Sequence, residues 1–120
     1  MEIRPAMEPR ALASLRALDG GAGERLREIL EIFLDDGYGL ILRIEETIAA
    51  RSARRLRGFA RQLSEIGAHV GAAGLVAVCL ELERLGEVGK TAEAGVYMDD
   101  LRKEFDLLES EIHEHLAQGH

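Results

Sequence analysis

The sequence predicts an all-α fold, an antiparallel up-down-up-down four-helix bundle with a short N-terminal helix in front of it. Apolar residues recur at three- and four-residue steps in four long segments, which is the period of one buried helix face. Both prolines precede residue 10, so no proline interrupts a helix downstream. Short turns separate the segments, and short connections favour antiparallel neighbours.

The chain is predicted to begin with a flexible leader, residues 1–8, followed by one bundle domain over residues 9–118. Pro9 suits the first turn of a short helix over residues 10–18. The glycine-rich segment 19–23 predicts a break after that helix.

A long second helix is predicted from Glu24 to about Arg51. Gly37 and Gly39 lie in its middle, and each costs about 1 kcal/mol relative to alanine in a helix interior. We therefore expect a bend at these glycines. The apolar stripe of this helix is Leu26, Ile29 or Leu30, Phe33, Leu40, Ile41, Ile44 and Ile48.

A third helix is predicted over residues 53–71, with Ser52 as its N-cap. Its buried face contains Leu56, Phe59, Ala60, Leu63, Ile66 or Gly67, and Val70. The opposite face meets water and is the predicted partner-binding surface, formed by Arg54, Arg57, Arg61, Ser64, Glu65 and Ala68.

Two more helices complete the predicted bundle. The fourth helix covers residues 75–85 and is ended by Gly86 and Gly89. The last helix runs from an N-cap at Thr91 to about residue 117. Cys79 lies on the inward stripe, which predicts a packed thiol rather than a reactive one. The inward residues of these two helices are Leu75, Val78, Cys79, Leu82 and Leu85, then Ala94, Tyr97, Leu101, Phe105, Leu108, Ile112 and Leu116.

Composition excludes several classes of function. The net charge of −7 argues against general nucleic-acid binding, and no apolar run approaches the ~20 residues that span a bilayer. Residues 1–10 lack the apolar core of a secretory signal. A single cysteine cannot form an internal disulfide, so the reducing cytoplasm is the expected compartment. Within this acidic chain, one arginine cluster indicates an acidic protein partner, and the alternative interpretation is a solvated helix face. The cluster consists of Arg51, Arg54, Arg55, Arg57 and Arg61.

Neither an enzyme nor a cofactor-binding or metal-binding protein is expected. The sequence offers no nucleophile–base pair and no glycine-rich phosphate loop before a helix. His113 and His115 are two residues apart, on different helix faces, so they make a poor metal chelator. They are better interpreted as members of solvated pairs with Glu109 and Glu111.

The stretch RQLSEIGAHVG, Arg61 to Gly71, resembles the active helix of histidine-containing phosphotransfer (HPt) domains. These domains are four-helix bundles that carry a phosphoryl group between aspartates of receiver domains on one surface histidine. Their motif reads roughly His-x-Leu-Lys-Gly-Ser-(Ser/Ala)-x-x-(apolar)-Gly. The resemblance extends over residues 11–116, and Leu63 and Gly71 match scaffold positions of the motif.

The chemical positions of the motif depart from the family pattern. Arg61 stands in the histidine place, Ser64 in the lysine place and Glu65 in the glycine place. A guanidinium stays protonated and has no lone pair, so Arg61 cannot accept a phosphoryl group. The resemblance therefore implies a signalling module, a monomer or weak homodimer, that binds a receiver domain or a histidine kinase without phosphotransfer.

Two alternatives stay open. His69 lies eight residues after Arg61, about 80° around the helix and 12 Å along it, and is a weak alternative phosphoryl acceptor. The second alternative is a structural or dimerising bundle without a receiver partner.

Overall fold

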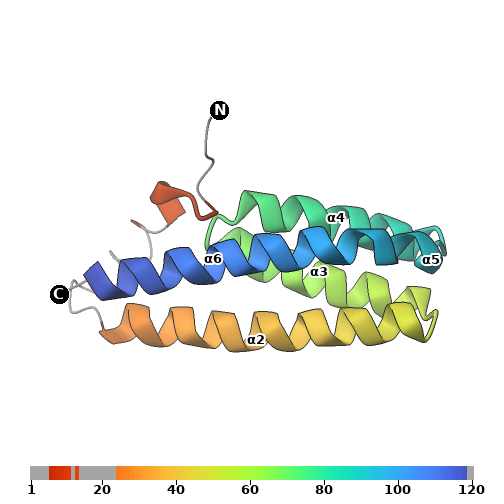
Figure 1. The fold of residues 1–120 in the computed structure, drawn as a ribbon, viewed down its shortest axis with the longest axis horizontal. Helices are drawn as coiled ribbons and strands as arrows, with labels where there is room; N and C mark the ends of the chain where they lie inside the picture. Colours follow the sequence, from red (N-terminus) through yellow and green to blue (C-terminus); the bar gives the residue numbers. More distant parts are fainter. Residues whose placement is uncertain (1–5, 12, 14–23, 119–120) are drawn as a thin grey trace.

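The computed structural model describes residues 6–11, 13 and 24–118, and the predicted antiparallel four-helix bundle is confirmed (Figure 1). Between the third and fourth long helices lie a short helix and a 3-10 turn, α5 (Thr91–Ala94) and η1 (Gly95–Tyr97). The long helices run alternately up and down: α2 (Glu24–Ala49), α3 (Ala53–His69), α4 (Ala73–Glu87) and α6 (Met98–Gln118).

One apolar core lies between the four long helices. The predicted stripes supply nearly all of its side chains, and Leu30, Leu63 and Leu108 are completely buried. Phe33 of α2 stacks on Phe105 of α6, with ring centroids 6.4 Å apart. No helix in the described part of the chain is both long and apolar enough to cross a bilayer.

The glycines do not interrupt α2, which is one helix from Glu24 to Ala49 and runs straight in the view of Figure 1, without the expected bend. Gly37 serves close packing instead. A Cβ at this position would lie 2.6 Å from Cε1 of Phe105, so the missing side chain makes room for the ring. The second glycine, Gly39, has no such neighbour, since a Cβ there would have no atom within 4 Å.

α3 and α4 pack closely through glycines. A Cβ at Gly67 would lie 3.2 Å from Val76. Gly86 was expected to end α4, but it is a buried residue inside the helix. A Cβ at Gly86 would lie 2.8 Å from the backbone nitrogen of Arg57, so this glycine sets the distance between the two helices beneath the arginine-bearing face. Gly89, with φ +76°, follows the helix end as expected.

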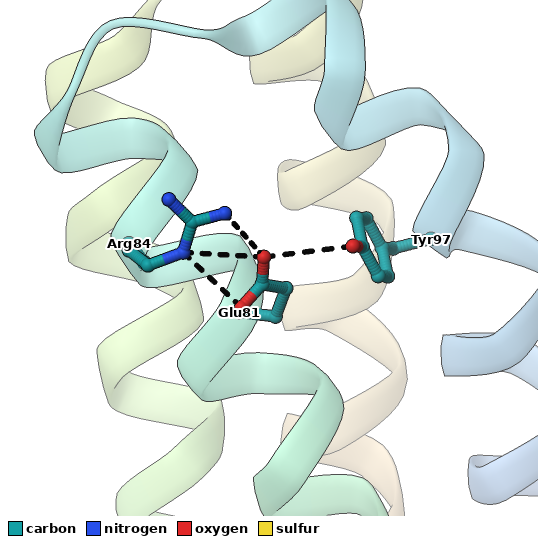
Figure 2. Close-up of polar contacts among 3 residues, drawn as sticks. All are labelled: Glu81, Arg84 and Tyr97. Atoms are coloured by element: carbon teal, nitrogen blue, oxygen red, sulfur yellow. Dashed lines mark hydrogen bonds and ion pairs between the residues drawn. The ribbon is translucent and has the colours of Figure 1, made fainter.

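The last predicted helix is divided. Thr91 is the first residue of α5 and not its N-cap, which is Lys90, and α6 begins only at Met98. Figure 2 shows the contact that fastens the connection to α4: the Tyr97 hydroxyl donates to Glu81 Oε1 at 3.5 Å. The Arg84 guanidinium donates to the same carboxylate and thereby lowers the pKa of Glu81.

The last residues of the predicted flexible leader are packed against the bundle. Ala6 and Met7 are buried, and both backbone N–H groups donate to the carboxylate of Glu111 on α6. The N–H of Glu8 donates to the carbonyl oxygen of Gly71 at 2.9 Å. Glu111 is thus engaged by the chain start, in place of the expected pairing with a histidine.

The predicted N-terminal helix and the predicted N-cap at Ser52 are each confirmed in part. Residues 9–11 and 13 are helical, whereas the rest of the predicted helix over residues 10–18 lies outside the described residues. Ser52 occupies the N-cap of α3 as expected, and its carbonyl oxygen accepts from the N–H of Leu56. Its side chain makes no capping hydrogen bond.

Candidate functional site

The candidate site is the exposed face of α3. The amphipathic pattern that buries Leu56, Ala60 and Leu63 leaves the opposite side of the helix in water. Five of the six predicted partner-binding residues are exposed and Ser64 is half-buried: Arg54, Arg57, Arg61, Ser64, Glu65 and Ala68. The helix therefore presents them together on one surface.

Arg61 lies at the midpoint of this 17-residue helix. Its Nε lies 3.4 Å from Oε1 of Glu65, one turn further on, and the two side chains are 63% and 64% exposed. An ion pair this open to water contributes little stability, typically a few tenths of a kcal/mol. Among the residues that the structure describes, Arg61 has no other ion pair, so its terminal nitrogens can donate to a partner.

Arg54 and Arg57 extend the positive surface toward the start of α3. Within the described residues, no carboxylate lies in ion-pair range of either side chain. The backbone of Arg57 is held against α4 at Gly86. This part of the site is a fixed helix surface with unneutralised positive charge, which suits an acidic partner.

Sequence reasoning missed an aromatic residue clamped by two arginines beside this face. The guanidinium carbons of Arg43, from α2, and Arg55, from α3, lie 5.9 and 5.8 Å from the ring centroid of the half-buried Phe59. The cluster of arginines in the sequence included Arg55, but only the pairing of α2 with α3 brings Arg43 to the same ring.

A groove between α2 and α3 was also missed. Its volume is about 340 Å³, and it begins at Arg43. Acidic side chains stand at its other end, and half-buried or buried apolar groups contribute to its lining: Asp35, Asp36, Gly39, Leu40, Arg43, Gln62 and Ile66. The available signal was Gly39, a glycine in the middle of a long helix.

The remaining reactive side chains do not form a site. His69 is exposed at the last position of α3, away from the mid-helix position of Arg61. In the described ranges, no three His, Cys, Asp or Glu side chains lie together as metal ligands would. Cys79 is completely buried, which confirms its predicted packing.

Burial raises the pKa of Cys79 to about 12, and the charge of Glu83 adds to this effect. The reactive thiolate is therefore absent near neutral pH, and we expect a thiol reagent such as DTNB to modify Cys79 only as fast as the bundle opens. Because an unfolded thiol ionises near pH 9, Cys79 also lowers the free energy of unfolding as pH rises above 9. Labelling kinetics at pH 8, with and without urea, test the protection of Cys79 from the reagent. Immediate labelling of the native chain would contradict that protection.

The architecture is similar to a solved structure, histidine-containing phosphotransfer protein B (HptB) from Pseudomonas aeruginosa PAO1. The two chains superpose with a TM-score of 0.88 and 22% identity, over 97% of this chain and 98% of the other. The chain therefore has the fold of a histidine-containing phosphotransfer protein, and the resemblance is confirmed at the level of the fold. No protein-family model and no curated protein matches the sequence.

Proposed function

We propose that this chain is a phosphorelay signalling module that binds the receiver domain of a response regulator, or a histidine kinase, without carrying phosphate itself. The observation that supports it best is Arg61. The chain has the fold of a histidine phosphotransfer protein, and the family motif, laid on the sequence, assigns the phosphoacceptor place to this arginine, which is exposed in the middle of α3. A guanidinium has five N–H donors and no lone pair, so it binds oxyanions but cannot be phosphorylated.

The charges of the face support an acidic partner. Arg54, Arg57 and Arg61 present positive charge on one helix of a chain whose net charge is −7. Receiver domains hold an acidic pocket around the aspartate that carries their phosphate. A guanidinium placed there forms charge-assisted hydrogen bonds with carboxylates where the phosphoryl group would otherwise pass.

Glu65 sets a second feature of the proposed function. It pairs with Arg61 and adds negative charge in a place where the family motif has glycine. That charge disfavours an arriving phosphoryl group, so the proposed role is binding rather than enzymatic catalysis or relay. The expected monomer or weak homodimer and the cytoplasmic location stay predictions.

Charge reversal tests the proposal. Arg61→Glu should weaken binding to a retained receiver by about 30-fold, or ~2 kcal/mol, because it removes one charge of an interface pair and repels the other. The matched control is Lys103→Glu, an equal charge change at an exposed position of α6. Calorimetry at 150 mM salt measures the affinity of both variants for the receiver. An equal loss of affinity in the two would place the contact elsewhere than at Arg61.

His69 supports one alternative, since it is an exposed imidazole on the same helix. Relay through His69 predicts acid-labile phosphate on the wild-type chain that disappears in His69→Ala. The structural alternative predicts a mass in light scattering that rises with concentration and does not change in Arg61 variants.

A further inference from the structure

The exposed face of α3 has a bare position at its centre. Gly58 is exposed, and a Cβ there would have no atom within 4 Å, so none of the packing that the structure describes requires this glycine. Alanine would stabilise the helix at this position. On the helix surface Gly58 is surrounded by the residues three and four places away, which are all exposed: Arg54, Arg55, Arg61 and Gln62. The backbone at Gly58 is therefore open to a partner between three arginines.

The outer face of α6 has the complementary shape and charge. Leu107 is 57% exposed near the middle of this helix. A shallow hollow of about 380 Å³ is lined by Lys103, Asp106, Leu107 and Ser110. Asp100 and Glu114 are exposed two helical turns before and after Leu107, on the same side of the helix. Leu107 is thus an apolar side chain between acidic ones, and Lys103 is the one basic residue of the hollow.

The two faces lie on opposite sides of the bundle, because α3 and α6 each pack on α2 and α4 and stand diagonally across the core. α3 carries four arginines and one glutamate, whereas α6 carries seven acidic residues and two basic ones, Arg102 and Lys103. Charge is therefore polarised across one chain. Two faces on opposite sides cannot both meet in one symmetric pair, so a contact between them joins copies head to tail.

We propose that the outer face of α6 docks on the exposed face of α3 of a second copy, with Leu107 placed over Gly58. The leucine packs on the open backbone and on the apolar stems of the surrounding arginines, and their guanidinium groups reach the acidic side chains of α6. The contact is small and the copies repel each other through their net charge of −7, so we expect a Kd on the order of 0.1–1 mM. Because the contact covers Arg61, a rising concentration of the chain masks its own partner-binding surface.

The test uses the full chain alone, in sedimentation equilibrium at ~150 mM salt, where a Debye length of about 8 Å screens the repulsion between whole chains more than the charges in contact. The average mass should rise with concentration without stopping at a dimer. Arg61→Glu and Leu107→Lys should each weaken the association about tenfold, because each places like charges opposite one another. Gly58→Gln should weaken it about tenfold by filling the open space.

Two matched controls separate the contact from a general effect of charge or apolar surface. Lys103→Glu changes the net charge as much as Arg61→Glu does, but it adds acidity to the α6 face and should not weaken the association. Leu80→Lys repeats the Leu107→Lys change at a position of α4 that is 52% exposed, and it should have no effect. Circular dichroism shows whether each variant keeps the fold.

Mixing two variants tests the direction of the contact. Arg61→Glu keeps an intact α6 face and Leu107→Lys keeps an intact α3 face, so the mixture should form a dimer that neither variant forms alone. A wild-type chain that stays monomeric up to ~1 mM, a mass that stops at a dimer, or equal losses in Arg61→Glu and Lys103→Glu would overturn the proposal. Retention of a receiver by the monomeric chain at micromolar concentration would still support the proposed function in each of these cases.

Discussion

The combined substitution Arg61→His, Ser64→Lys and Glu65→Gly should turn the chain into a phosphoryl acceptor. Histidine supplies the lone pair that attacks the phosphorus of the receiver's aspartyl phosphate, whose P–O bond breaks and leaves the aspartate carboxylate on the receiver. Lysine supplies a positive charge for the transferred group. Removing Glu65 takes away a carboxylate that now lies beside position 61, with 3.4 Å between its oxygen and the Arg61 nitrogen. We expect acid-labile phosphate on the triple variant after incubation with a phosphorylated receiver, from no measurable signal in the wild-type chain.

Two controls locate the cause of that gain. Arg61→His alone should remain a poor acceptor, because Glu65 then faces the incoming phosphoryl group without its arginine partner. Adding His69→Ala to the triple variant should leave the phosphate in place, which assigns it to position 61. A folded triple variant that takes no phosphate from any receiver that it binds would contradict the assignment of Arg61 to the acceptor position.

The second large effect is expected for Gly86→Ala, which should destabilise the bundle by about 2–3 kcal/mol and lower Tm by roughly 10 °C. An added Cβ would lie 2.8 Å from the nitrogen and 3.0 Å from the Cα of Arg57, and 2.9 Å from the carbonyl oxygen of Ala53. These are backbone atoms, so no side chain can rotate away and α3 and α4 must separate.

Gly58→Ala is the matched control for this effect. It makes the same substitution in α3, at an exposed position where the Cβ would have no atom within 4 Å. It should stabilise the chain by up to about 1 kcal/mol. Urea unfolding followed by circular dichroism measures both variants, and destabilisation of equal size in the two would refute the close-packing role of Gly86.

The repeat of apolar residues was sufficient to predict the four long helices and their inward faces. The division of the last helix was missed, because the stripe from Ala94 to Leu116 continues through it. The structure replaces one turn of that segment by the 3-10 turn η1, and it adds a tertiary contact that the stripe does not predict, between Tyr97 and Glu81 on α4, 16 residues away in sequence.

The roles of the glycines were the least predictable, because they depend on tertiary packing. A glycine in a helical pattern indicates a bend, an end, a close neighbour or an open space, and only the packing distinguishes these. Gly37 faces a phenyl ring, Gly86 faces a backbone and Gly39 faces solvent in a groove. The exposed face of α3 was predictable from period alone, whereas the groove beside it required the pairing of α2 with α3.

The most direct measurement is incubation of the wild-type chain with a panel of phosphorylated receiver domains, scoring both retention and acid-labile phosphate on this chain. Retention without phosphate, weakened by Arg61→Glu and not by Lys103→Glu, is the result that a non-phosphorylated binding module predicts. Phosphate that appears on the wild-type chain and is lost in His69→Ala would contradict that account and establish a relay through His69.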